Sequence, residues 1–285
     1  MKIAAVNGVN LEYELTGSGE PVLLISPVLA DGFVPLVGEA CLAEHQQLIR
    51  YHKRGWVDST HTAGPVSVSD HVADAAALLD HLEVDRAHVV GHSSGAAVAA
   101  QLALDEPERV ATVVLLELSL FSVPSGPGFL AAAGPVFDAY ANGDHERALA
   151  MFLSAVSGLE WGTCRDLLDE RIPGALDQAV KDAETFFGVE LPALTQWSLG
   201  EEDAAAIRQP VLSILGSDTA PLWVDVAEFL RNSVANVEER TIDGVGHLLH
   251  IQRPQPVAEA IADFLQRHPI VDAPVTELVG TRPIR

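Results

Sequence analysis

The chain has 285 residues, 48% of them hydrophobic, which is enough for one large α/β domain or two small ones with a sizeable core. Its 40 acidic and 17 basic side chains give a formal net charge of −23 at pH 7. Because such a surface repels phosphate backbones and anionic lipids, we expect neither a nucleic acid nor a membrane as partner. The N-terminus lacks the apolar core of a signal peptide, and two cysteines, Cys41 and Cys164, cannot form a disulfide framework. We therefore expect a cytoplasmic protein.

Residues 1–15 alternate between apolar and polar side chains around Gly8, a pattern that predicts an antiparallel hairpin. Continuous apolar runs then predict strands buried on both faces, at residues 21–26, 47–51, 87–90, 110–118 and 211–215, and residues 237–242 are a last candidate strand. Apolar residues at helical spacing predict helices at residues 70–82, 94–104 and 254–266. Strands that alternate with helices indicate an α/β fold with a doubly wound, mostly parallel central sheet and helices on both faces.

Residues 122–208 interrupt this alternation, because they contain no candidate strand. Helical patterns occur there at residues 128–142, 145–157, 165–171 and 176–187. Aromatic side chains concentrate in the same stretch, namely Tyr140, Phe152, Trp161, Phe186, Phe187 and Trp197. We predict an all-helical cap inserted into a core domain that residues 1–121 and 209–268 form. Residues 269–285 have no strong pattern, and we expect them to be disordered or to pack on a neighbour.

The pattern G-x-S-x-G stands at Gly91-His92-Ser93-Ser94-Gly95, directly after a predicted strand and directly before an Ala-rich predicted helix. A sharp turn between strand and helix holds a serine hydroxyl above the sheet, and small residues on either side let the two backbones approach. The helix N-terminus adds free N–H groups and a positive dipole. We therefore predict Ser93 as a nucleophile; the alternative is a serine that merely caps the helix.

A serine hydroxyl needs a base at neutral pH, and the chain has 11 histidines. His247 follows a predicted strand and a Gly-rich loop, which can deliver an imidazole to the carboxyl edge of the sheet, so we predict His247 as the base. His250 is a poorer candidate, and His92 is expected to line a wall of the site. We expect solvated surface positions for seven others, which are His45, His52, His61, His71, His81, His145 and His268.

Three motifs together resemble the α/β-hydrolase fold: the G-x-S-x-G turn, the loop from Tyr51 to Ser59, and Gly244-Val245-Gly246-His247. The middle loop is similar to the family pattern D-x-R-G-x-G-x-S, from which His52 and Val57 depart. The resemblance covers residues 1–268 and places the helical insertion where the family has its cap. It implies a serine hydrolase, similar to esterases and lactonases, that uses neither a cofactor nor a metal.

The acid that orients the histidine has two candidates. Glu117 ends an otherwise apolar strand, where a carboxylate is costly unless something uses it. Some members of the family, haloalkane dehalogenases among them, place the acid there. Most members place it three residues after a glycine, but Asp218 comes one place early after Gly216. We favour Glu117 and keep Asp218 as the alternative; a structural ion pair or a helix cap would explain either residue without catalysis.

Acyl transfer also needs two N–H donors where negative charge develops. The resemblance implies the backbone N–H groups of Ser94 and Val28, although Ser26-Pro27-Val28 replaces the usual His-Gly of that loop. The aromatic-rich cap favours an apolar substrate, although ordinary helix packing also explains many of these rings. As substrate-binding residues we predict Leu29, His92, Trp161, Phe187 and Trp197.

The function predicted from these residues is hydrolysis of a carboxylic ester or lactone of a mainly apolar small molecule, through an acyl-enzyme. Activity should fall as His247 protonates, near the reference pKa of about 6.5. C–C bond hydrolysis with the same triad remains an alternative, as does a hydrolase-like receptor that binds a small ligand. A serine nucleophile argues against dehalogenase chemistry, which uses an aspartate in this fold. We expect a small-molecule substrate as partner and a monomer or homodimer.

Overall fold

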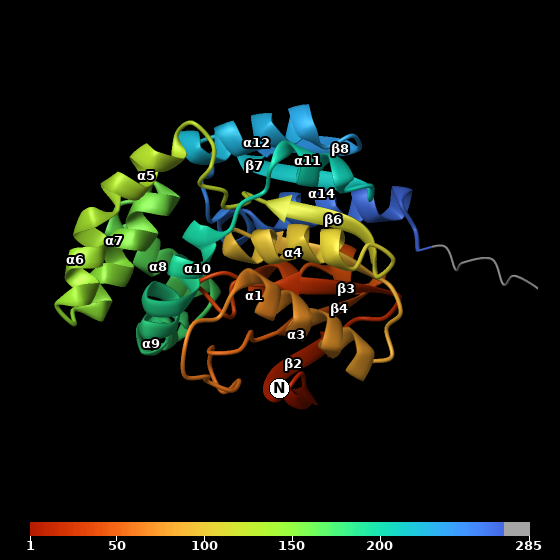
Figure 1. Ribbon diagram of the computed structural model, residues 1–285, viewed down its shortest axis with the longest axis horizontal. Coiled ribbons are helices and arrows are strands. Elements are labelled where there is room, and N and C mark those ends of the chain that lie inside the picture. The colour runs from red at the N-terminus through yellow and green to blue at the C-terminus, as the bar shows by residue number, and fades with distance from the viewer. Residues whose placement is uncertain (271–285) are drawn as a thin grey trace, which may run out of the picture.

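The computed structural model describes residues 1–270, and its centre is an eight-stranded sheet in the order β1-β2-β4-β3-β5-β6-β7-β8 (Figure 1). β1 and β2 form an antiparallel hairpin, β2 pairs antiparallel with β4, and the strands from β3 to β8 are parallel. The strands are β1 (Lys2–Val6), β2 (Val9–Thr16), β3 (Glu20–Ile25), β4 (Gln46–Tyr51), β5 (Ala87–His92), β6 (Val110–Leu116), β7 (Val211–Gly216) and β8 (Val237–Ile242). The predicted doubly wound, mostly parallel sheet is confirmed.

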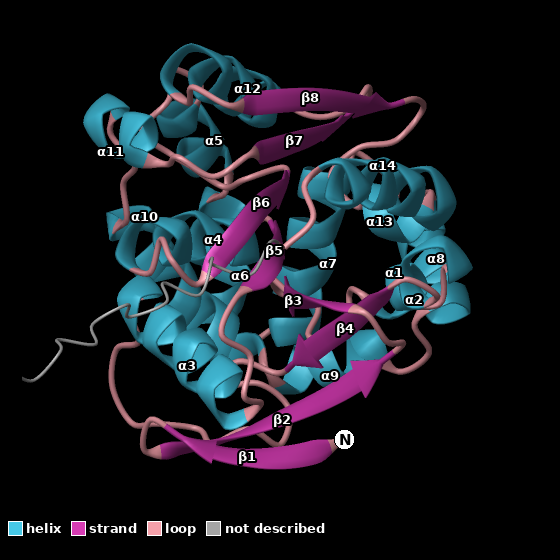
Figure 2. Cartoon of the chain, turned by 90° about the vertical axis from the view of Figure 1, so that its right-hand side faces the viewer, coloured by secondary structure: helices cyan, strands magenta, loops and turns pink. Residues whose placement is uncertain are grey.

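Helices cover both faces of the sheet (Figure 2). One face carries α3 (Val68–His81), α4 (Ser94–Asp105) and α12 (Pro221–Ser233), and the other carries α1 (Val34–Val37), α2 (Ala40–Ala43), α13 (Leu249–Gln252) and α14 (Pro254–Arg267). Alternate residues of one strand enter two different cores: Leu23 belongs to the first core and Leu24 to the second. Burial on both faces is why a central strand such as β6 is a continuous apolar run, whereas the edge strand β8 is half-buried or exposed over most of its length. The periodicity did not predict α1, α2, α12 or α13.

Between β6 and β7 the chain forms only helices, and all but the last of them lie beyond the carboxyl ends of the parallel strands (Figure 1), whereas the last packs against α12. They are α5 (Gly126–Ala132), α6 (Gly134–Ala141), α7 (His145–Ser157), α8 (Trp161–Arg171), α9 (Ala175–Lys181), the π-helical turn η1 (Glu184–Glu190), α10 (Leu191–Gln196) and α11 (Glu201–Ala206). The predicted helix 128–142 is divided, because Gly134-Pro135 starts a new helix. α8 begins earlier than predicted, since the Glu160 side chain accepts from the N–H of Thr163.

Of residues 269–285, only Pro269 and Ile270 are described, and the backbone N–H of Ile270 donates to Glu20 on β3 at 2.8 Å. The prediction for the rest of this segment lies outside the described residues. Within residues 1–270, no helix combines the length and the apolar character that a bilayer span requires.

Candidate active site

Ser93 occupies the turn between β5 and α4 in a strained backbone conformation, with φ 55° and ψ −118°. Two glycines make this turn sterically feasible. A Cβ on Gly91 would overlap the carbonyl oxygen of Gly95, and a Cβ on Gly95 would overlap the carbonyl oxygen of Ile25 on β3. A side chain at either position would push helix and strand apart, so the glycines permit a geometry that holds the Ser93 hydroxyl beyond the edge of the sheet.

Two backbone N–H groups next to Ser93 are available to an oxyanion. Ser94 is the first residue of α4, and an N–H at that position has no partner within its own helix. Val28 follows β3 and borders the same cavity as Ser93. Among the described residues, no acceptor receives a hydrogen bond from the Val28 N–H. The two predicted donors are therefore close to the nucleophile, and neither N–H has an acceptor among the described residues.

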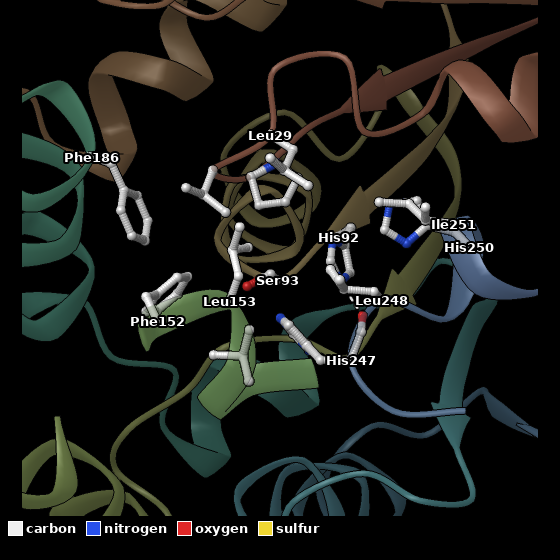
Figure 3. A pocket seen from close by; sticks show the side chains of 13 residues that line it. Leu29, His92, Ser93, Phe152, Leu153, Phe186, His247, Leu248, His250 and Ile251 are labelled. Atoms are coloured by element: carbon white, nitrogen blue, oxygen red, sulfur yellow. Dashed lines mark hydrogen bonds between the residues drawn. The ribbon is translucent and has the colours of Figure 1, made fainter. Parts of the chain in front are cut away.

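The imidazole of His247 points toward the Ser93 hydroxyl (Figure 3), and its Nδ1 lies 2.7 Å from Oε2 of Glu117. The Ser93 hydroxyl itself hydrogen-bonds Oγ of Ser119 at 3.0 Å. His247 is buried and stacks on Trp223, with ring centroids 3.9 Å apart and an interplanar angle of 22°. The indole plane and the carboxylate together hold the imidazole in one orientation, with Nε2 free for the hydroxyl.

Glu117 lies just after the carboxyl end of β6 with φ 46°, another strained backbone conformation. Its Oε1 accepts from the N–H of Gly216 at 2.8 Å, and its Oε2 accepts from the hydroxyl of Thr219 at 2.8 Å. Asp218, the alternative acid, is exposed and accepts from the hydroxyl of Ser217 at 2.8 Å. The geometry thus brings Glu117, and not Asp218, to His247.

Burial shifts both members of this pair toward their neutral forms. It raises the pKa of the Glu117 carboxyl to about 7, against the opposing hydrogen bonds from Gly216 and Thr219. It lowers the pKa of the His247 imidazole to about 3. A neutral imidazole is the form that can accept a proton, so the site keeps its base available below the reference pKa of about 6.5.

Two further histidines surround His247. Nε2 of His92 lies 2.8 Å from the carbonyl oxygen of His247, so the His92 ring donates an N–H that fixes the backbone of the histidine loop. The ring of His250 lies 4.2 Å from that of His92, and both of its nitrogens are buried without a hydrogen-bond partner among the described residues. Burial holds the pKa of both rings well below the usual range.

Ser93 and His247 border two cavities, which we call the chamber and the small cavity. The chamber has a volume of about 190 Å³ and extends beneath the insertion helices. The small cavity has about 20 Å³, room for roughly one water molecule, beside Val28 and Leu29 (Figure 3). Neither lining contains Asp, Glu, Lys or Arg among the described residues. The chamber is bordered mainly by Phe121, Phe129, Val136, Phe137, Phe152 and Trp223.

The substrate-binding prediction needs correction for three of its five residues. Leu29 and His92 border the small cavity, but Trp161, Phe187 and Trp197 are absent from the described linings of both cavities. Phe187 packs between neighbouring rings of the insertion, and Nε1 of Trp197 donates to Gln101 on α4 at 2.9 Å. These rings stabilise the helices, whereas Phe152 and Phe186 border both cavities beside Ser93.

Sequence reasoning also missed the residues that support the site. Ser119, Thr219 and Trp223 contact Ser93, Glu117 and His247 respectively, and no motif distinguishes them. The surface assignment was wrong for His52 and His71, which are 3% and 4% exposed. The described residues contain no group of three or more His, Cys, Asp or Glu that could hold a metal ion.

A family model described as alpha/beta hydrolase fold matches residues 28–254. A putative carbamate hydrolase of Azorhizobium caulinodans, RutD, is 36% identical over 117 residues, 41% of this chain and 44% of that relative, so the chain spans less than half of its length. The hydrolase YugF of Bacillus subtilis is 26% identical over 198 residues, 66% of this chain and 68% of the relative.

Two solved structures share the fold over nearly the whole chain. The enol-lactonase from Burkholderia xenovorans has a TM-score of 0.77 and 23% identity, covering 93% of this chain and 100% of that one. A thermophilic esterase from Thermogutta terrifontis has a TM-score of 0.75 and 20% identity, covering 94% and 99%. At these identities the likeness concerns the fold alone. Together with the family match, it confirms the resemblance seen in the motifs: the chain belongs to the alpha/beta hydrolase fold family.

Proposed function

We propose that the protein is a serine hydrolase that cleaves an uncharged, mainly apolar carboxylic ester or lactone. The observation that carries this proposal is the Glu117–His247 contact of 2.7 Å beside a strained Ser93, at the junction of an apolar chamber and two free N–H groups. Each part has a role in acyl transfer, and a structural role explains them less well, because a buried carboxylate and a strained serine both destabilise the fold.

The proposed reaction runs in two halves. Ser93 Oγ turns from Ser119 toward His247, gives its proton to Nε2 and bonds to the substrate carbonyl carbon, whose oxygen becomes an oxyanion on the N–H groups of Val28 and Ser94. His247 returns the proton to the leaving alkoxide as the C–O bond breaks. Water then loses a proton to His247, attacks the acyl carbon and releases the acid, and Ser93 regains its hydrogen. Glu117 orients the imidazole through Nδ1 and stabilises its charged form.

The cavity linings support the substrate class. The described linings of the two cavities contain no Asp, Glu, Lys or Arg, and their histidines are held neutral by burial. A carboxylate or ammonium group on the substrate would therefore be buried without a charged partner. An alkyl or aryl group would instead contact the phenylalanines of the chamber. We propose that the insertion helices act as a cap that closes this chamber. An enol-lactonase and an esterase among the similar structures are compatible with this class.

The test is a fluorophosphonate that carries an alkyl chain, which phosphonylates an activated serine and releases fluoride. Intact-protein and peptide mass spectrometry should find one adduct, on Ser93, in the wild-type protein and none in Ser93→Ala. Hydrolysis of p-nitrophenyl acetate, butyrate and octanoate, and of an alkyl-substituted lactone, should then identify the preferred class. An adduct on another residue, or no adduct, would contradict the proposal.

A further inference from the structure

Glu190 ends the π-helical turn η1 of the insertion and is 4% exposed. Its Oε2 lies 2.6 Å from Nζ of Lys53 and accepts from Nε1 of Trp56 at 3.0 Å. Its Oε1 accepts from the hydroxyl of Ser94 at 2.5 Å. One carboxylate of the insertion therefore contacts both the loop that follows β4 and the first residue of α4, directly after Ser93.

The surroundings of Glu190 fix its carboxylate in one position. Lys53 is also buried and compensates the charge, because an unpaired ion at this depth would be strongly destabilising. With Trp56 and Ser94 the carboxylate accepts three hydrogen bonds, so rotation would break at least one of them. Neither Lys53 nor Glu190 borders the chamber or the small cavity among the described residues, so the pair does not contact the proposed substrate.

Ser94 is the residue through which this network reaches the chemistry. Its backbone N–H is a proposed oxyanion donor, and as the first residue of α4 it has no intrahelical hydrogen bond at that N–H. Its side chain is tied to Glu190. Oxyanion stabilisation depends on donors held within a fraction of an ångström of the productive position. The hydrogen bond between the Ser94 side chain and Glu190 should therefore affect the reaction rate.

We propose that Glu190 is a positioning residue, which holds the Ser94 N–H in oxyanion geometry and makes turnover depend on correct seating of the insertion on the core. The inference rests on the proposed function, since an oxyanion forms only if Ser93 attacks a carbonyl. π-Helical segments are frequent at functional sites, and here the π-helical turn brings the Glu190 carboxylate to Ser94, directly after the turn between β5 and α4.

A second buried carboxylate of the insertion, that of Asp182, serves as a matched control. Asp182 is likewise buried, and it accepts from the N–H of Val57 at 3.4 Å and from Gln178. It contacts the same loop as Glu190 but makes no contact with Ser94. If the carboxylates only fasten the insertion to the core, Asp182→Asn and Glu190 variants should behave alike.

The decisive pair consists of two double variants that both remove the buried charges. Lys53→Met with Glu190→Gln keeps a carbonyl that accepts from Ser94, whereas Lys53→Met with Glu190→Leu has similar volume and no acceptor. We expect the Leu variant to react with a fluorophosphonate, and to turn over p-nitrophenyl butyrate, roughly tenfold more slowly than the Gln variant. KM should stay within about twofold, and a trifluoromethyl ketone, which mimics the oxyanion, should bind correspondingly more weakly. Asp182→Asn should match the wild-type protein.

Ser94→Ala keeps the backbone N–H and leaves Glu190, Lys53 and Trp56 in place. It therefore tests the Ser94–Glu190 hydrogen bond if the Leu variant does not fold. It should also lose roughly tenfold in kcat at unchanged KM. Equal rates for the Gln and Leu variants, or wild-type rates for Ser94→Ala, would overturn the positioning role while leaving the proposed function intact. Failure of the wild-type protein to react with the fluorophosphonate would overturn both.

Discussion

Glu117 and His247 are 130 positions apart in the chain, yet Oε2 of one lies 2.7 Å from Nδ1 of the other. The sheet accounts for this contact: β6 ends next to β7, and the loop after β8 passes over the carboxyl ends of both strands. The contact favours Glu117 over Asp218 as the acid, because Asp218 is exposed and bonded to Ser217.

The acid is tested by comparing Glu117→Gln with Asp218→Asn in ester hydrolysis. The glutamine can hold the imidazole in the wrong tautomer and cannot stabilise its charged form, so kcat should fall roughly 1,000-fold or more. Asp218→Asn should remain within about threefold of wild type. A large loss in Asp218→Asn with activity retained in Glu117→Gln would assign the acid to the other loop.

The pH dependence of kcat/KM reports the base of the free enzyme. His247 must be neutral to accept the Ser93 proton, and burial lowers its pKa from the usual 6.5 to about 3. Burial also raises the pKa of Glu117 to about 7, so activity should fall in part as the pH drops through 7, because a protonated carboxyl stabilises the charged imidazole less well. Loss of the base itself should come only well below pH 6.5, in contrast to the value expected from the sequence alone. Initial rates with p-nitrophenyl butyrate, in buffers of constant ionic strength, measure both steps. Complete loss of activity in a single step with a midpoint at 6.5 or higher would contradict the effect of burial on His247.

His250 contributes a pH dependence of stability. Burial lowers its pKa in the folded protein, so between that pKa and about 6.5 the unfolded chain binds a proton that the folded chain does not. The free energy of unfolding should therefore decrease as the pH falls through 6.5. His250→Leu removes the group that takes up this proton, together with two buried nitrogens that have no partner among the described residues. The change in the free energy of unfolding per pH unit should therefore be smaller in this variant, by up to about 1.4 kcal/mol. Urea unfolding at pH 7.5 and 5.5 tests this, and equal slopes in the two proteins would exclude it.

The chamber should set the chain-length preference. Val136 is buried and borders the chamber, so Val136→Phe fills part of it and Val136→Ala enlarges it. The ratio of kcat/KM for p-nitrophenyl octanoate to that for the acetate should fall roughly tenfold in the first variant and stay level or rise in the second. The acetate serves as the internal control, because it leaves most of the chamber empty. Unchanged ratios in both variants would place the substrate elsewhere.

The parts of the site that could be predicted from the sequence are those with a strong local signal. Ser93 stands between a predicted strand and helix with glycines at fixed offsets, and Glu117 is a costly carboxylate at the end of an apolar strand. The strands were predictable for a similar reason, since burial on both faces excludes polar residues over a whole run.

The remaining parts depend on contacts between distant segments. His52 is buried because Glu12 and Asp31 bind its two ring nitrogens at 2.9 and 3.0 Å, and neither partner is its neighbour in the sequence. Glu190 meets Ser94 across 96 positions. Which aromatic rings face the chamber depends on how the insertion helices are rotated, and helical periodicity is ambiguous where a helix is apolar on more than one side.

The central claim is that the Ser93 hydroxyl is the nucleophile. The most direct measurement compares the turnover of p-nitrophenyl butyrate by wild-type protein and by Ser93→Ala, both checked for equal thermal stability. We expect the wild-type protein to hydrolyse the ester and the variant to lose roughly 10,000-fold or more in kcat. A variant that hydrolyses the ester within a few-fold of the wild-type rate would contradict the account.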